Sequence, residues 1–376
     1  MLDKKHLMIQ QLTREFAVNE IEPCIDYAEE HGEFPDELWE KAARCGFTGC
    51  CIPKEYGGQG GDFFSSIIMM EQICRTAVGA ASMFMANSLS GMPILKCGTE
   101  EQKQKYLRPM AEGTKRCSFA LTEPGAGSDT GALTTTARQD GDFFILNGRK
   151  TFITLGPTCD YAVVFANVIR DGGKKALTAF IVDADLPGFS RGKREKKLGL
   201  HASGTCDLIF DDVRVPKENV LGSVGGGWKV AGSGLSAGRI NVASQSLGGA
   251  QGCLDEAIKY SGERVQFGKP IGKFQNTRFK IAEMDAKIEA GRQIIYSAAQ
   301  MVDRGEDALL QASRAKWYMS EVANEVAYKC LQIHGGYGYM EGFAIERFYR
   351  DLRIMPVYEG TSEVQLMVIS SAIMNK

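Results

Sequence analysis

The chain has 376 residues, of which 44% are hydrophobic and 24% charged, and its formal net charge is −2. This length allows two or three domains with a large buried core. A chain so close to neutral has no overall charge that would attract nucleic acid or an anionic membrane surface. The longest uninterrupted apolar stretches are far shorter than the roughly 18 residues of a membrane helix. The composition therefore predicts a soluble globular protein without a nucleic-acid or membrane partner.

The eleven cysteines are an odd number, which argues against a fully paired disulfide framework, and none lies in a Cys-x-x-Cys arrangement. Adjacent Cys50 and Cys51 suit neither a zinc site nor an ordinary bridge. The histidines do not cluster at ligand spacing, so no protein-bound metal is predicted; they are His6, His31, His201 and His334. The first residues lack a signal-peptide pattern. Together with the thiols, this predicts a bacterial cytoplasm, with the mitochondrial matrix as the alternative.

Three regions with different patterns of apolar and polar residues follow one another. Up to about residue 113, apolar residues recur at helical spacing, and residues 52–58 form a turn-rich break. Helices are predicted there over residues 7–25, from residue 36, and over residues 63–74 and 80–89. A run of basic residues at 191–197 (Arg191, Lys193, Arg194, Lys196 and Lys197) is predicted to be a solvated loop.

From about residue 117 to residue 221 the pattern changes to short runs rich in β-branched and aromatic residues, punctuated by Gly, Asn or Asp. Strands are predicted over residues 143–146, 161–165, 177–182 and 208–210. Long helical patterns then return over residues 240–264, 276–304, 307–335 and 362–374. The sequence thus predicts an α+β protein: an N-terminal helical domain (1–115), a middle antiparallel β domain (116–222) and a C-terminal helical bundle (223–376).

Two segments of the middle region carry candidate binding groups. Residues 121–129 read LTEPGAGSD, and two glycines with two hydroxyl side chains let backbone amides approach a phosphate or a ring edge. A plain glycine-rich turn is the alternative. Asn147-Gly148 predicts a hairpin turn followed by a strand. Phe152 and Thr154 share one face of that strand, where they could cover a planar cofactor or form a half-buried strand face.

Two segments of the last region are also informative. Residues 264–275 link two long helices, and Arg264 with Phe267 would suit a pyrophosphate and a ring. The alternative is a helix end with a cation near its dipole. In residues 357–363, VYEGTSE, Glu359 precedes a helix that Thr361 or Ser362 would cap. A desolvated Glu can act as a base, whereas a loop Glu is usually only solvated. Residues 232–237 only mimic a dinucleotide-binding motif, because no βαβ unit surrounds them.

Taken together, these segments resemble the acyl-CoA dehydrogenase family over nearly the whole chain. Four motifs stand in the family's order: residues 121–129, 147–154, 264–275, and a C-terminal stretch from Gln332-Ile333-His334-Gly335-Gly336 through Arg350-Asp351 to Tyr358-Glu359-Gly360-Thr361. The resemblance implies a C-terminal four-helix bundle. It also implies FAD held between the subunits of a homotetramer that is built as a dimer of dimers.

The resemblance carries the family's cofactor contacts onto this chain. One subunit would contribute Phe119, Leu121, Thr122, Ser128, Phe152 and Thr154. The neighbouring subunit would contribute Arg264, Phe267, Gln275, Gln332, Gly335 and Gly336. Thr361 and Glu363 would reach the adenine half of FAD. Substrate contacts would come from Ser128, Arg239, Tyr358 and Gly360.

The family places its catalytic base at one of two positions. One is the Glu of the Tyr-Glu-Gly-Thr motif, here Glu359, and the other precedes the Arg that matches Arg239. The second position is Gly238, which cannot abstract a proton, so the resemblance assigns the base to Glu359. Glu359 would then take the α-proton of an acyl-CoA while the β-hydrogen leaves as hydride to the flavin N5. The backbone N–H of the base and a ribityl hydroxyl would polarise the thioester carbonyl.

The resemblance also names electron-transferring flavoprotein as the electron acceptor. Three departures from the family pattern are Leu155, Ser236 and Gly342, and none touches the base. Alternatives are the same chemistry run as an enoyl-CoA reductase, an oxidase, and a non-catalytic docking relative. Met83, Phe84 and Met85 could shorten the acyl pocket or simply face the core.

Overall fold

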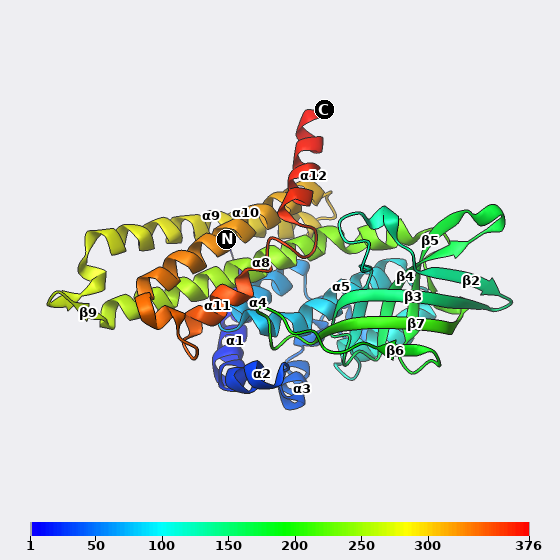
Figure 1. Ribbon diagram of the computed structural model, residues 1–376, viewed down its shortest axis with the longest axis horizontal. Helices are drawn as coiled ribbons and strands as arrows, with labels where there is room; N and C mark the ends of the chain where they lie inside the picture. Colours follow the sequence, from blue (N-terminus) through cyan, green and yellow to red (C-terminus); the bar gives the residue numbers. More distant parts are fainter. Residues whose placement is uncertain (1, 376) are drawn as a thin grey trace.

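The computed structural model describes residues 2–375 and confirms the predicted fold class. Figure 1 shows the β sheet at one end of the molecule, with the long C-terminal helices extending away from it over the N-terminal helices. One apolar core is shared by the N-terminal and C-terminal helices. A second core joins the N-terminal helices to the sheet, and a third lies among the strands.

The N-terminal region is helical, as predicted. Its α-helices are α1 Lys4–Phe16, α2 Ile25–His31, α3 Asp36–Arg44, α4 Phe63–Cys74, α5 Ala81–Cys97, α6 Glu100–Gln102 and α7 Arg108–Ala111. Every residue of α4 is buried, because other helices surround it. Within residues 2–375, one helical stretch, Val78–Cys97, is long and apolar enough by length and composition to span a membrane. Three quarters of that stretch is buried in the fold, where it serves as a core helix.

The strands form one sheet in the order β6-β7-β3-β2-β4-β5-β8, with β1 added beside β4. They are β1 Cys117–Ala120, β2 Thr136–Asp140, β3 Phe143–Thr154, β4 Tyr161–Ile169, β5 Lys175–Asp183, β6 Phe189–Arg191, β7 Thr205–Pro216 and β8 Val220–Leu221. The sheet is mainly antiparallel, and β1 and β2 each pair with β4 in parallel. These parallel pairs were not predicted, because pairing direction depends on long-range contacts.

The hairpin turn predicted at Asn147-Gly148 is wrong, since both residues lie inside β3. The register between β3 and β7 shifts there, as in a β-bulge. A Cβ at position 148 would stand 2.5 Å from the Thr135 hydroxyl oxygen, and the φ of Gly148 is +148°, so the bulge requires glycine. The chain turns before β3 instead, at Gly141.

The C-terminal region contains α8 Gly227–Glu263, a short hairpin (β9 Val265–Gln266 and β10 Lys269–Pro270), α9 Gln275–Asp303, α10 Leu309–His334, α11 Ala344–Leu352 and α12 Ser362–Met374. Helices α8, α9 and α10 pack side by side, and α12 projects from the body of the chain (Figure 1). Helix α8 begins at Gly227 rather than at residue 240, and it includes the Gly232–Gly234 segment. A Cβ at Gly234 would stand 3.7 Å from Pro93 of α5, an ordinary contact distance, so space does not require glycine there.

The basic run at 191–197 is only partly solvated. Arg191 donates to the Gly156 and Cys159 carbonyls, Arg194 pairs with Glu33, and Lys197 donates to the Ser203 carbonyl. The run therefore holds the segment after β6 against the N-terminal helices, in addition to meeting solvent.

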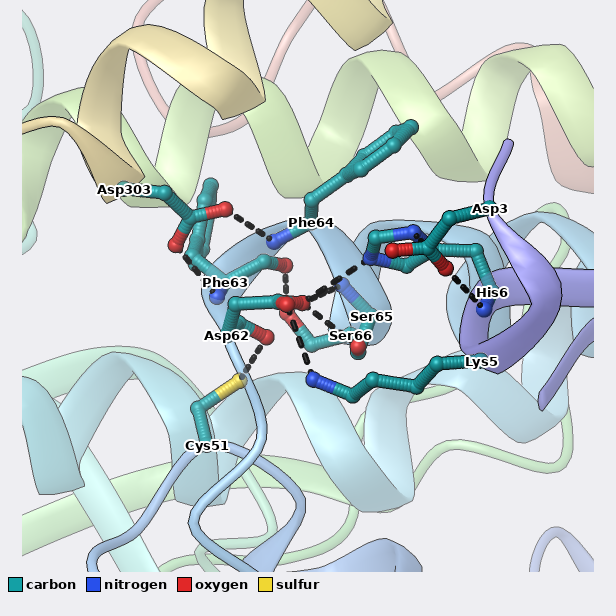
Figure 2. Close-up of polar contacts among 10 residues, drawn as sticks. All are labelled: Asp3, Lys5, His6, Cys51, Asp62, Phe63, Phe64, Ser65, Ser66 and Asp303. Carbon is teal, nitrogen blue, oxygen red and sulfur yellow. Dashed lines mark hydrogen bonds and ion pairs between the residues drawn. The ribbon is translucent and has the colours of Figure 1, made fainter. Parts of the chain in front are cut away.

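The N-terminus of α4 is held by two aspartates from different parts of the chain (Figure 2). Asp62 caps the helix by accepting from the Ser65 N–H at 2.7 Å. Asp303, at the end of α9, accepts from the Phe63 N–H at 2.7 Å and the Phe64 N–H at 3.0 Å. Lys5 of α1 donates to Asp62 at 2.8 Å. These contacts satisfy N–H groups that a helix leaves unpaired, and they join α1, α4 and α9.

We expect Asp62→Ala to lower the free energy of unfolding by about 1 kcal/mol at pH 7, the usual value of an N-cap. Burial alone would raise the pKa of Asp62, but hydrogen bonds from Lys5 and Ser65 hold it well below its ordinary value of 3.8. The contribution is therefore present above that value and is lost as the pH falls below it. Thermal unfolding from pH 3 to pH 7 should show the gap between variant and wild type closing at acid pH. Asp285→Ala, at an exposed position of α9, is the control, and an equal gap at every pH would contradict the analysis.

Candidate active site

Glu359 lies in the turn between α11 and α12 and has a left-handed backbone conformation, with φ +53°. Gly360 follows with φ +86°, so two consecutive left-handed residues turn the chain back toward the bundle. A Cβ at position 238 of α8 would lie 3.0 Å from the Glu359 Oε2 atom and 3.2 Å from the Leu89 side chain. The carboxylate thus occupies the space beside Gly238, where α5 and α8 meet. Positions 359 and 238, which the resemblance offers as the two alternatives for the base, are therefore neighbours in this chain.

Two buried side chains hold this turn. The Lys316 ammonium of α10, which has no solvent exposure, donates to the Gly360 carbonyl at 2.7 Å. The Gln365 amide of α12 donates to the Gly360 carbonyl at 2.9 Å and to the Glu359 carbonyl at 3.3 Å. A left-handed non-glycine residue is strained, and such a conformation persists only where its surroundings over-determine it. Lys316 and Gln365 supply that constraint.

The charges around Glu359 set its proton affinity. Burial raises the pKa of Glu359, while the positive charges of Lys316 and Arg239 oppose this increase. Burial also lowers the pKa of Lys316 to about 8. Arg239 donates to the Ser313 hydroxyl at 3.0 Å, and its Nε atom is buried without a partner among the described residues. A buried carboxylate with a raised pKa is suited to general-base chemistry.

The Tyr358 side chain packs against the core. Its hydroxyl donates to the Gln245 side-chain oxygen at 2.5 Å, and the Gln245 amide in turn lies 2.8 Å from the Met85 sulfur. Met83, Phe84 and Met85 are all buried. Met85 therefore meets the residue next to the base through Gln245, so the apolar segment of α5 both fills the core and borders the site.

The glycine-rich segment 121–129 is held by a buried ion pair. Lys150 of β3 donates to the Glu123 carboxylate at 2.8 Å and to the Leu121 carbonyl at 2.9 Å. Glu123 also accepts from the backbone N–H groups of Thr134 and Thr135. Although burial would raise the pKa of Glu123, these donors hold it at about 2, so the carboxylate is ionised at neutral pH. The pair fixes the loop that carries Leu121 and Thr122.

The predicted cofactor residues fall into groups that are far apart within one chain. Phe119, Leu121, Thr122, Ser128, Phe152 and Thr154 lie on the sheet or its loops. Arg264 and Tyr337 make a cation–π contact at 5.3 Å, which brings the β9–β10 hairpin together with the Gly335-Gly336 turn. Figure 1 shows β9 at the end of the molecule opposite the sheet. Phe267, Gln275 and Gln332 belong to the elements at that far end. Thr361 caps α12 beside the base, and Glu363 lies in the first turn of that helix.

Four residues that support the site were missed by the sequence analysis: Glu123, Lys150, Lys316 and Gln365. Glu123 and Lys150 stand inside two of the sequence motifs, but nothing local indicates that they pair. Lys316 had a usable signal, because it lies on the apolar face of its helix between Ala312 and Met319. A lysine at such a position is seldom fully buried without a partner.

Ten cysteines are free thiols: Cys24, Cys45, Cys50, Cys51, Cys74, Cys97, Cys159, Cys206, Cys253 and Cys330. Residues 2–375 contain no group of three or more His, Cys, Asp or Glu side chains that could hold a metal ion.

Three family models match this chain in order. They are the acyl-CoA dehydrogenase N-terminal domain over residues 3–114, the middle domain over residues 118–213 and the C-terminal domain over residues 225–374. The chain belongs to the acyl-CoA dehydrogenase family, whose members are FAD-dependent oxidoreductases.

Individual relatives agree with this assignment. The caffeyl-CoA reductase-Etf complex subunit CarC of Acetobacterium woodii is 50% identical, and the match covers 99% of each chain. The 3-(aryl)acrylate reductase of Clostridium sporogenes is 49% identical, again over 99% of each chain. The butyryl-CoA dehydrogenase structure from Megasphaera elsdenii superposes with a TM-score of 0.96 at 41% identity, covering 100% of this chain and 99% of that one.

The residues present fit a flavin. A Cβ placed at Gly125 or at Gly127 of the 121–129 loop would have no described atom within 4 Å, so the backbone there is open to a ligand. Phe152 presents a ring that is 68% exposed beside this loop. At the far end, Gly335 and Gly336 are equally open and Phe267 is 93% exposed. Large exposed rings next to open backbone are surfaces that a planar cofactor can cover.

We expect Lys316→Met to reduce activity at pH 7 and to shift the acid limb of the pH–rate profile upward by about one pH unit. Loss of the ammonium removes the charge that opposes the rise in the Glu359 pKa, so the base stays protonated to a higher pH. The profile of kcat from pH 5.5 to pH 9 tests this. Lys316→Arg should keep most of the wild-type profile, and Lys329→Met, at a surface ion pair of the same helix, should leave it unchanged. An unshifted profile in Lys316→Met would contradict the electrostatic role.

Glu123→Gln should weaken flavin binding, because the Lys150 ammonium is then buried without a counter-charge. Removing one member of a buried pair costs about 3–5 kcal/mol. The flavin-to-protein absorbance ratio after gel filtration measures the effect. The double variant Glu123→Gln/Lys150→Met should recover part of the loss in thermal stability. Full flavin content in the single variant would show that the pair does not hold the loop.

Proposed function

We propose that this protein interconverts an acyl-CoA thioester and its trans-2-enoyl-CoA, with Glu359 moving the proton at the α-carbon. The observation that supports this most directly is the Glu359 carboxylate, which a clamped turn holds beside Gly238 and whose pKa burial raises. A bound FAD would supply the two-electron chemistry at the β-carbon. The role of the chain is to align the two C–H bonds and to exclude water from the base.

The backbone of the turn also offers a hydrogen-bond donor to the substrate. Gln365 and Lys316 donate to the backbone carbonyls of residues 359 and 360. The Glu359 N–H makes no hydrogen bond to any described residue, so it can donate to the thioester carbonyl of a substrate. Such a fixed donor stabilises the negative charge that develops on the oxygen as the α-proton leaves.

The same chemistry can run as oxidation of an acyl-CoA or as reduction of an enoyl-CoA. The two relatives at 50% and 49% identity are named as reductases, which favours enoyl-CoA reduction in the cell. In that direction a protonated Glu359 delivers the α-proton, and its raised pKa favours the protonated form. The Acetobacterium woodii relative is a subunit of a complex with Etf, so we propose an electron-transferring flavoprotein as the redox partner. The intact base is evidence against a purely non-catalytic docking protein.

We further propose a homotetramer in which each FAD site is shared. Two groups of the residues expected to contact FAD lie at opposite ends of the folded molecule, one on the sheet and one beside β9. A second subunit would therefore complete the site. Large apolar side chains are exposed at the hairpin end and along α12, as an interface would require; they include Phe267, Tyr339, Met340, Met367 and Met374. Free thiols such as those of Cys74, Cys253 and Cys330 suit a reducing compartment, and we propose a bacterial cytoplasm.

We expect anaerobic addition of a reactive acyl-CoA to bleach the flavin band of the wild type, and the matching enoyl-CoA to restore the band of the reduced enzyme. Glu359→Gln should bind flavin normally and lose at least about a thousandfold in both rates, because proton transfer has no other carrier. Stopped-flow absorbance measures the two directions. Rapid bleaching by the Gln variant would refute the assignment of the base. A wild type that reacts with neither acyl-CoA nor enoyl-CoA would refute the proposed activity.

A further inference from the structure

The loop of residues 197–203, between β6 and β7, contacts both helical regions of the chain. The His201 Nδ1 atom of this loop lies 3.0 Å from the Glu29 carboxylate of α2. Arg350 of α11 donates to the same carboxylate at 3.0 Å. The loop therefore joins the middle domain to the N-terminal and C-terminal domains at one place.

Asp351, in the last turn of α11, holds this loop against the C-terminal domain. It is only 2% exposed, and its carboxylate accepts from the Leu200 N–H at 2.5 Å. The other buried residues of α11 are apolar; they are Ile345, Phe348 and Leu352. Burying a carboxylate is costly, so its place on this face is explained by the loop N–H that it satisfies.

The loop backbone is fitted closely to the end of α11. Leu200 has a left-handed φ of +50°, which is strained for a leucine and persists only where its surroundings hold it. A Cβ at Gly199 would stand 2.5 Å from the Arg350 carbonyl oxygen and 2.7 Å from the Asp351 backbone nitrogen. A side chain at position 199 would therefore push the loop away from α11.

Backbone pairing connects the loop to a strand that is predicted to contact the cofactor. Directly after the loop, the Gly204 carbonyl accepts from the Leu155 N–H at 2.9 Å. Thr205 of β7 then pairs with Thr154 of β3, one of the residues expected to contact FAD. The loop and this end of β3 are thus fixed relative to each other.

In the other direction, the chain runs from Asp351 along α10 to Glu359. Three donors, spaced four residues apart on α10, each bond a backbone carbonyl of this segment. They are Asn324 to Leu352 at 2.9 Å, Ser320 to Met355 at 3.1 Å and Lys316 to Gly360 at 2.7 Å. Residues four apart lie on one face of a helix, so a single face of α10 supports the segment. The segment consequently has little freedom to absorb a shift at the Asp351 end.

We propose that Asp351 is a positioning residue for Glu359: by holding the 197–203 loop against α11, it fixes the base relative to the strand that carries Thr154. The proposal rests on the proposed function and adds a residue that acts through the base. Glu359 belongs to the C-terminal domain and Thr154 to the middle domain, so their relative placement depends on contacts between domains. A misplacement of about 1 Å can cost about a hundredfold in rate.

The test compares Asp351→Leu with Asp351→Asn in the FAD-loaded enzyme at pH 7.5. Burial raises the pKa of Asp351 to about 6, so the carboxylate is the main form at that pH. Asparagine keeps an oxygen that accepts from the Leu200 N–H, whereas leucine has no acceptor. The probes are butyryl-CoA and 3-phenylpropanoyl-CoA, and anaerobic stopped-flow absorbance gives the rate constant of flavin reduction per bound flavin.

We expect Asp351→Leu to lower this rate constant at saturating probe by at least about tenfold, and Asp351→Asn to stay within about threefold of the wild type. The dissociation constant of the probe should change less than about threefold in both variants, because the proposed role is in placing the base and not in binding the thioester. A merely structural role would lower stability and flavin content without changing the rate constant per bound flavin.

Hydrogen exchange provides a readout that does not use the reaction. In Asp351→Leu, exchange should become faster in residues 197–205 and also in residues 352–361. The matched control is Asp303→Leu, which removes a carboxylate that also accepts backbone N–H groups, but at the start of α4. The control should lower thermal stability without changing the rate constant or the exchange of either segment.

Gly199→Ala reaches the same contact from the loop side and replaces Asp351→Leu in every comparison if that variant does not fold. It should lower the rate constant in the same way. The double variant should be no slower than the slower single variant, because both changes break one contact.

A rate constant within about threefold of the wild type in Asp351→Leu overturns the proposal. Equal losses in Asp351→Leu and Asp303→Leu also overturn it, as does faster exchange that stops at residues 197–205. A wild type that neither probe reduces counts instead against the proposed function, and the exchange of residues 352–361 then decides whether Asp351 holds the segment that carries Glu359.

Discussion

The geometry of the active site depends on a buried lysine that donates to a backbone carbonyl. Lys316 has no solvent exposure and bonds the Gly360 carbonyl at 2.7 Å. This contact holds the turn in which Glu359 adopts a left-handed conformation. The same ammonium places a positive charge near the carboxylate. One side chain thus contributes both to the position of the Glu359 carboxylate and to its proton affinity.

A second buried lysine holds a loop in the same way. Lys150 is also fully buried, and it bonds the Leu121 carbonyl at 2.9 Å as well as the Glu123 carboxylate. In both places a lysine on a regular element holds a loop that carries functional groups. A long, flexible ammonium would ordinarily reach solvent, and burying it is costly without charged or carbonyl partners. This cost explains why each loop is held in one arrangement: any other arrangement would leave a buried charge unpaired.

Helix α8 connects these local interactions to the rest of the fold. Its glycines allow close approach to neighbours that a side chain would prevent: a Cβ at Gly248 would stand 2.3 Å from the Glu71 carbonyl of α4. Gly238 leaves room for the Glu359 carboxylate. The helix therefore carries the core contact and the space for that carboxylate along one continuous element. The residues predicted to contact FAD are not joined in this way, because one group lies on the sheet and its loops and another at the β9 end of the molecule.

The sequence alone was sufficient for the fold class and the family, and it predicted Glu359 as the base, because these inferences depend on local patterns. Helical and strand periodicity appear directly in the order of the residues. Glu359 stands in a short motif, and the alternative position for the base is Gly238, which has no group that could accept a proton. Only the tertiary structure revealed the parallel strand pairs, the bulge at Gly148 and the supports at Lys316, Gln365, Glu123 and Lys150. Glu123 and Lys150 are 27 residues apart, and Lys316 and Gly360 are 44 apart. Pairings over such separations are selected by burial and packing of the whole chain, which no local pattern of residues records.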